Sequence, residues 1–191
     1  VTNMENMFES AKSFNQPISN WDVSNVTDMD SMFQYAESFN QPLNNWDVSN
    51  VTNMEKMFYH ASSFNQPINT EEITKEDGTT YIAWNVSNVT NMEYMFMDAQ
   101  SFNQPINNWN VSNVTNMENM FESAKSFNQP IGNWNVSKVT DMSLMFYVAQ
   151  SFNQDISNWD VSNVTNMENM FAEASSFNQP INTEEITKED G

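Results

Sequence analysis

A 25-residue period constrains the fold of this chain more than any other feature of its sequence. The valine of the V-T-[ND]-M stretch recurs every 25 residues, apart from one step of 38 between Val51 and Val89. The seven copies begin at Val1, Val26, Val51, Val89, Val114, Val139 and Val164. A unit of this size cannot bury its own apolar face and must stack on its neighbours. The sequence therefore predicts one tandem-repeat solenoid over residues 1–191, not two globular domains.

A longer period of 113 residues is superimposed on the short one. The stretch INTEEITKEDG occupies residues 68–78 and again residues 181–191. Most of the first copy lies in the 13 extra residues of the long step (38 − 25), so four units and one insertion make a super-repeat. We interpret the chain as a slice of a longer array, in which residues 182–191 are a truncated second insertion.

The insertion at residues 70–83 leaves two structures open. Thr, Ile and Tyr residues on either side of Asp77 and Gly78 favour a β-hairpin that closes on an Asp-Gly turn. A flexible acidic loop fits the same composition equally well. A hairpin here is expected to project from the edge of the coil, just before Trp84.

The apolar residues within each unit predict one short strand and one short helix. Trp21, Asp22 and Val23 alternate as a half-buried strand does. The i, i+3, i+4, i+7 spacing of one helix face is shown by Met29, Met32, Phe33 and Ala36. A threonine before this stretch, with an acidic residue three positions later, resembles a capping box in six of the seven units.

These elements predict an α/β repeat solenoid of the leucine-rich-repeat type, with a short parallel strand and a short helix in each coil. Helices need more room than strands, so the strands should line a concave side. The alternative is a straighter β-solenoid, in which M-x-x-M-F-x-x-A forms only a turn. We favour the helix, because the capping box and the apolar period agree.

The repeat N-W-[DN]-V-S-x-V-T-x-M-x-x-M-F-x-x-A-x-S-F-N-Q-x-[IL] resembles the BspA-type leucine-rich-repeat surface proteins. That group includes a repeat domain common in mycoplasma surface lipoproteins and also found in protists and large DNA viruses. The resemblance covers nearly the whole chain outside the insertion. It implies an extracellular or cell-surface location and a role in adhesion or protein–protein interaction, and it brings no catalytic residues.

The charge of the chain restricts its partners. The net charge is −19, and all six cationic side chains are lysines. Without a basic stripe, neither nucleic acid nor an anionic membrane surface is an expected partner. No apolar run is long enough to predict membrane insertion. We expect other proteins, such as those of a host surface or matrix, or neighbouring copies of the chain end to end.

Neither catalysis nor a bound cofactor is predicted. The chain has no cysteine, and its single histidine is His60. Without a second histidine or a thiol, a metal site or a catalytic triad at His60 is not expected. Nucleotide-binding and metalloprotease motifs do not occur. We therefore expect a non-enzymatic protein.

Polar side chains on the outward side of the predicted strands form the candidate partner-binding face. Three interpretations stay open: solvated or Asn-bonded ladders, recognition of an extended ligand, and a Ca²⁺ column at Asp22, Asp47 and Asp160. Asparagine replaces aspartate at half of the positions of the column that contains these aspartates, which favours the ladders. The face comprises Asn20, Asp22, Asn45, Asp47, Asn108, Asn110, Asn133, Asn135, Asn158 and Asp160.

Two kinds of N-glycosylation sequon recur in the chain. The N-V-T asparagines lie in a tight turn, where we expect them to serve the backbone. The N-V-S asparagines face outward and are the better acceptors, namely Asn85, Asn110 and Asn135.

Two functions compete at this point. The resemblance favours an adhesion or interaction protein, whereas the near-identity of the repeats favours a structural subunit of an extracellular filament or surface layer.

Overall fold

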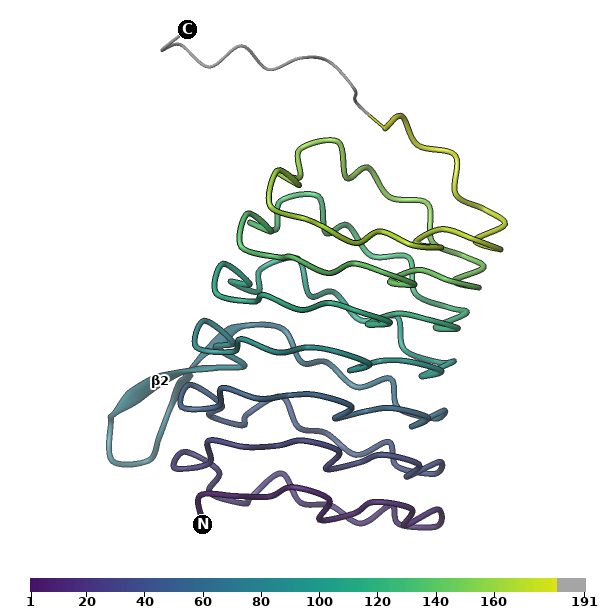
Figure 1. Ribbon diagram of the computed structural model, residues 1–191. Coiled ribbons are helices and arrows are strands. Elements are labelled where there is room, and N and C mark those ends of the chain that lie inside the picture. Colours follow the sequence, from purple (N-terminus) through teal and green to yellow (C-terminus); the bar gives the residue numbers. More distant parts are fainter. Residues whose placement is uncertain (182–191) are drawn as a thin grey trace, which may run out of the picture.

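Residues 1–181, which the computed structural model describes, form a stack of coils in which each unit makes one turn of the chain (Figure 1). The coils follow one another in sequence order along the stack (Figure 1). Neighbouring coils are parallel, and isolated β-bridges join them at one residue per coil, from Asn3↔Asp28 to Asp141↔Asn166. The predicted second insertion, residues 182–191, lies outside the described residues.

The predicted α/β, leucine-rich-repeat-like class is wrong. No helix occurs among residues 1–181, and the two strands found there are antiparallel and belong to the insertion. The segment 21–23, which we expected to be a strand, has no regular secondary structure. Parallel pairing between coils is confined to the isolated bridges, so there is no sheet to line a concave side.

The spacing that suggested a helix comes from two consecutive tight turns. The first turn spans residues 4–7, and the amide of residue 7 donates to the carbonyl of residue 4 at 3.3 Å. The second turn spans residues 8–11, and the amide of residue 11 donates to the carbonyl of residue 8 at 3.0 Å. The third residue of each turn has a positive φ, 57° at Asn6 and 58° at Ser10. Two four-residue turns place the first and last residues of each turn inside, which reproduces the i, i+3, i+4, i+7 pattern.

The other amides of these turns bond to the next coil. The amides of residues 6, 8 and 10 donate to the carbonyls of residues 30, 32 and 34 at 2.7–2.9 Å. In a helix, each amide would bond four residues back within its own segment. Helix axes also need roughly 8–10 Å between them. Phe8 and Phe33, on neighbouring coils, have ring centroids only 5.5 Å apart, so helices cannot stack here.

The threonine column forms a ladder between coils and does not cap helices. The amide and the hydroxyl of Thr27 both donate to the carbonyl of Thr2, at 2.8 and 3.2 Å. Equivalent bonds continue up the stack as far as Thr165. The amide of Asp30, expected to be capped by the threonine, instead donates to Oδ1 of Asp28 at 3.0 Å.

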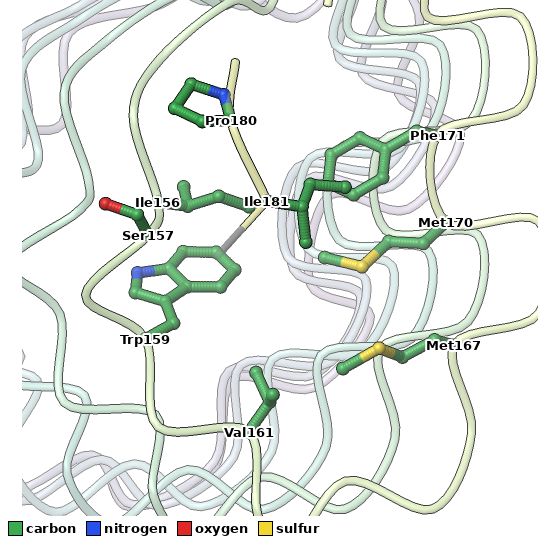
Figure 2. A pocket seen from close by; sticks show the side chains of 9 residues that line it. All are labelled: Ile156, Ser157, Trp159, Val161, Met167, Met170, Phe171, Pro180 and Ile181. Carbon is green, nitrogen blue, oxygen red and sulfur yellow. The ribbon is translucent and has the colours of Figure 1, made fainter. Parts of the chain in front are cut away.

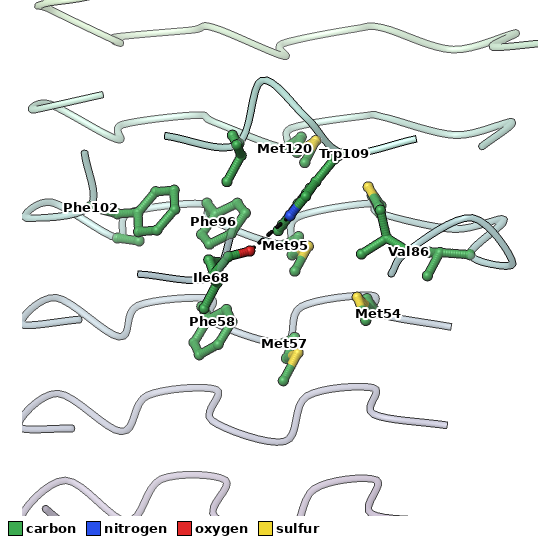
Figure 3. Packing of buried hydrophobic residues seen from close by; sticks show 14 of the residues in the cluster. Met54, Met57, Phe58, Ile68, Val86, Met95, Phe96, Phe102, Trp109 and Met120 are labelled. Carbon is green, nitrogen blue, oxygen red and sulfur yellow. Dashed lines mark hydrogen bonds between the residues drawn. The ribbon is translucent and has the colours of Figure 1, made fainter. Parts of the chain in front are cut away.

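The core consists of columns of identical side chains. Tryptophan, phenylalanine, methionine and valine of the middle coils are buried, and the indole of Trp109 donates to the carbonyl of Ile68 at 2.8 Å (Figure 3). Two phenylalanine columns lie beside each other, with Phe96 and Phe102 stacked at 4.2 Å. Each aromatic ring therefore contacts its own coil and both neighbours.

A second ladder explains the F-N-Q motif. Oδ1 of Asn40 accepts bonds from the amide of Asn65 and the side chain of Gln66, each at 3.0 Å. The same pair of bonds recurs at the other coil junctions. This ladder satisfies polar groups of the return segment next to the core.

The insertion, for which the sequence left two structures open, folds as a β-hairpin of β1 (Glu71–Thr74) and β2 (Thr80–Ala83). Gly78 supplies a φ of 83° in the connecting turn. The chain re-enters the stack through Trp84, which is buried and also has a positive φ of 49°. The hairpin lies along the side of the stack and points toward the N-terminal coils (Figure 1).

An apolar hollow of about 150 Å³ lies at the last described coil (Figure 2). Its lining includes Trp159, Met167, Met170 and Phe171, members of the columns that form the core elsewhere. Met167 is 42% exposed, whereas its equivalent Met142 is fully buried. The hollow is thus the core exposed at the edge of the described coils.

Val148 tests the turn geometry. Its φ of 57° strains a β-branched side chain, whereas asparagine adopts this region more readily. We expect Val148→Asn to raise the free energy of unfolding by about 1 kcal/mol, measured by urea denaturation. Val148→Thr keeps the branch at Cβ and should show no such gain; equal stability of both variants would contradict the turn assignment.

Gly132 and Asp155 are expected to depend on each other. A Cβ at residue 132 would lie 2.3 Å from the Asp155 carbonyl oxygen, and Asp155 stands where the other coils have proline. Gly132→Ser should therefore lower the free energy of unfolding by roughly 1–3 kcal/mol. Adding Asp155→Pro, which restores the pairing used at other junctions, should recover most of that loss. Strictly additive effects in this double-mutant cycle would show that the two positions are independent.

Candidate partner-binding surfaces

The outward Asp/Asn column is explained by a local turn. Oδ1 of Asp22 accepts bonds from the amide and hydroxyl of Ser24, at 3.1 and 2.6 Å. Oδ1 of Asn135 accepts the same pair of bonds from Ser137, at 3.1 and 2.7 Å. Because an amide oxygen serves as well as a carboxylate oxygen, the turn accepts either residue. The serine bonds also hold the pKa of Asp22 below its ordinary value.

The three aspartates proposed as a Ca²⁺ column are not brought together. Asp22 and Asp47 lie on successive coils, whereas Asp160 lies four coils further along the stack. Among residues 1–181, no group of three acidic or histidine side chains is placed to hold a metal ion.

The N-V-T asparagines join neighbouring coils. Nδ2 of Asn50 donates to the carbonyl of Ser24 at 2.7 Å, and Asn88, Asn113 and Asn163 make the equivalent bond. Nδ2 is the atom to which a glycan would be attached, and here it already donates a hydrogen bond. The acceptor belongs to the preceding coil, whereas the sequence suggested an acceptor in the asparagine's own turn. These asparagines are part of the stack.

The N-V-S asparagines are held through their oxygen. Each of Asn85, Asn110 and Asn135 accepts the amide of the serine two positions on, at 3.1–3.2 Å. Asn110 and Asn135 are exposed, whereas Asn85 is half-buried. All three stay N-glycosylation candidates, with Asn110 and Asn135 the more accessible.

The predicted partner-binding face is divided by the structure. Asn108 exchanges side-chain bonds with the backbone of Thr70 at the base of the hairpin, at 2.9 and 3.2 Å. Nδ2 of Asn133 donates to the carbonyl of Asn107 at 2.7 Å, and Asn158 is exposed. These residues do not share one site.

Four residues of that face do meet in a cleft beneath the hairpin, which we call the hairpin cleft. Its volume is about 310 Å³. The hydroxyl of Tyr81 donates to the carbonyl of Asn45 at 2.5 Å, and Nζ of Lys75 lies 5.1 Å from the Tyr81 ring centroid. The lining consists of Ser19, Asn20, Trp21, Asp22, Val23, Ser24, Asn45, Asp47, Lys75 and Tyr81.

Sequence reasoning missed a second surface, which the variation between coils could have revealed. Four positions per coil vary most, those equivalent to Asn6, Glu9, Ser10 and Lys12 of the first coil. The Ser10 position holds six different residues in seven coils, whereas the neighbouring core positions do not change. All four positions belong to or follow the two tight turns, and we call them the variable turn face.

Aromatic residues gather on the variable turn face in the second to fourth coils, and this tyrosine cluster comprises Tyr35, Tyr59, His60 and Tyr94. The rings of Tyr35 and His60 stack at 4.8 Å, and the rings of Tyr59 and Tyr94 meet edge-on at 6.3 Å. Nδ1 of His60 lies 2.5 Å from Oδ2 of Asp98. Each of these side chains is only half-buried, so the cluster is accessible.

The tyrosine cluster is tied together by polar contacts as well as by ring packing. The hydroxyl of Tyr35 donates to that of Tyr59 at 3.3 Å. Burial raises the pKa of Tyr59 to about 12. Nζ of Lys56 lies 5.3 Å from the ring centroid of Tyr94. The cluster therefore presents a largely preformed aromatic surface.

A row of carboxylates lies beside the first turn in six of the seven coils, with Ser143 at this position in the remaining one. Glu93 accepts a bond from Nδ2 of Asn116 at 2.9 Å. Burial, followed by repulsion from Glu55 and Glu118 on the adjacent coils, raises the pKa of Glu93 above its ordinary value of 4.5. The ionised carboxylate of Glu93 therefore destabilises the stack near neutral pH.

We expect Glu93→Gln to raise the melting temperature at pH 7. The folded protein holds the Glu93 proton more tightly than the unfolded chain, so the ionised carboxylate destabilises the fold at high pH. That penalty disappears as the pH falls below the ordinary pKa of 4.5, and the advantage of the variant should disappear with it. Thermal unfolding between pH 3 and pH 8 measures this, with the exposed Glu71→Gln as control. A lower melting temperature at pH 7 would contradict the repulsion.

Comparison with known proteins finds one family. The family model described as "Mycoplasma protein of unknown function, DUF285" matches residues 1–82 and residues 74–186, which together span most of the chain. The two matches overlap within the insertion, as expected of a repeat family. Neither the curated proteins nor the solved structures provide a match. The described part of the chain, residues 1–181, also contains no helix that is long and apolar enough to cross a bilayer.

Proposed function

We propose that this chain, which belongs to the Mycoplasma family DUF285, is a non-enzymatic repeat protein that binds partner proteins through its variable turn face. One observation carries the proposal: variation between coils gathers on turn positions outside the core columns, while the core and ladder positions are nearly constant. A protein selected only for length has no need of such variation.

The chemistry of the variable turn face suits a protein partner. Tyrosine is enriched at protein interfaces, and half-exposed rings such as those of Tyr59 and Tyr94 supply contact area at low entropic cost. The net charge of −19 with no arginine disfavours nucleic acid. Our proposal includes an extracellular or cell-surface location and a partner on a host surface or matrix, as the resemblance to BspA-type surface proteins implies.

The alternative is a structural subunit of an extracellular filament or surface layer. The regularity of the junctions favours it, because the ring centroids of the first phenylalanine column are 5.5–5.7 Å apart at every junction. Such a stack builds length from one interface. Electron microscopy and concentration-dependent light scattering of the native protein distinguish the two functions, since a filament shows regular end-to-end growth.

Tyr59 and Tyr147 provide a matched test of the binding function. They occupy the same position of two coils, where Ala172 stands in another, but only Tyr59 belongs to the tyrosine cluster. We expect Tyr59→Ala to weaken binding to an immobilised panel of fibronectin, laminin and collagen, or to intact host cells, by about tenfold or more. Tyr147→Ala should leave binding almost unchanged.

Circular dichroism melting curves of both variants serve as the control for folding. Equal effects of the two substitutions would remove the tyrosine cluster from the binding surface. An absence of binding to the whole panel and to cells, together with ordered filaments, would favour the structural function.

A further inference from the structure

The hairpin cleft contains two charges that its local turns do not require. Asp22 and Asp47 lie on successive coils and each accepts the bonds of a serine two positions on. In three other coils asparagine fills this position and makes the same turn, as at Asn135. The turn therefore does not require a carboxylate at this position, and the two successive coils that carry Asp22 and Asp47 lie beneath the hairpin.

Attachment of the hairpin accounts for only part of these charges, because Lys75 attracts Asp22 but cannot neutralise both aspartates. Lys75 is the cation of the cleft, yet the ion pairs among residues 1–181 join other side chains, Lys12–Glu37, Lys56–Glu55 and His60–Asp98. The hairpin is instead held by the bond from Tyr81 to the carbonyl of Asn45 and by the backbone at the strained, buried Trp84.

Three acceptor oxygens in the hairpin cleft are left unused by the hydrogen bonds of the described residues. Oδ1 of Asn45 is buried without a hydrogen-bond partner among residues 1–181, although a buried amide oxygen is normally bonded. The serines use Oδ1 of each aspartate, so the second carboxylate oxygen of each is left for a ligand. The hydroxyl of Tyr81 is already donated to the backbone. These three oxygens can accept hydrogen bonds from a ligand with several N–H donors.

We propose that the hairpin cleft binds the guanidinium group of an arginine side chain on a basic partner protein, between the carboxylates of Asp22 and Asp47. A guanidinium presents five N–H donors in a plane and suits paired carboxylates better than an ammonium group does. The two aspartates and Lys75 leave the cleft with one net negative charge, which one guanidinium neutralises. This site shares no residue with the tyrosine cluster of the variable turn face. The arginine site can therefore be disproved without disproving the proposed function, and the reverse also holds.

The test is an NMR titration of the full chain with N-acetyl-arginine amide as the probe. We expect saturable shifts confined to the amides around Ser24, Ser49 and Tyr81. The uncharged isostere N-acetyl-citrulline amide should produce no such shifts. Asp22→Asn/Asp47→Asn should weaken the arginine complex by at least about tenfold, the effect expected when a charged pair is removed.

The matched control is Asp28→Asn/Asp141→Asn, which removes the same two charges from another column where asparagine is common. This control should bind arginine like the unaltered chain. Equal weakening in both double variants would reduce the effect to general electrostatics and overturn the site. So would an equal response to citrulline, or no local shift with arginine.

Two further outcomes would also overturn the proposal. In the same titration, galactose could shift the amide signals of the cleft while the arginine probe leaves them unchanged. That result would show that the cleft binds neutral polyols and not a guanidinium group. A fall of several degrees in the melting temperature of Asp22→Asn/Asp47→Asn would give the charges a structural role, because asparagine elsewhere in the column supports the turn.

Discussion

Hydrogen bonds between alternate backbone amides and the neighbouring coil are the interaction on which the structure depends. They set a coil spacing that is too narrow for helices, and the ring centroids of Phe8 and Phe33 follow it at 5.5 Å. Within residues 4–11, half of the amides bond to the next coil, and the amides of residues 7, 9 and 11 close tight turns within the coil. Those turns require a left-handed backbone conformation, with a positive φ, at positions such as Asn6 and Ser10. The aromatic columns, the threonine ladder and the Asn-Gln ladder then repeat at the same spacing.

The repeat, the buried columns and the place of the insertion could be predicted from the sequence, whereas the secondary structure of the coil could not. Met29, Met32, Phe33 and Ala36 satisfy a helix period and a pair of four-residue turns equally well. The distinguishing signal was the weak helix preference at the third turn residue, which includes serine, asparagine and tyrosine. Thr27 misled in the same way, because its hydroxyl serves the preceding coil and not its own segment.

The candidate surfaces were predictable only in part. The outward column drew attention to Asp22 and Asp47, but sequence alone could not show that the hairpin folds back over them. The tyrosine cluster was missed because its members look unrelated until the turns bring Tyr35 against His60 across a coil junction. Positions that vary in a repeat protein are those that the stack leaves unconstrained. The variable turn face and the hairpin cleft thus occupy the surface that the ladders do not use.

The ladders also determine how the molecule responds to tension. A load applied along the stack meets the coil junctions in series, and each junction is closed by the same set of bonds and stacked rings. Such a chain yields one junction at a time and lengthens in steps of about one coil, so the remaining coils keep their contacts while the force is absorbed.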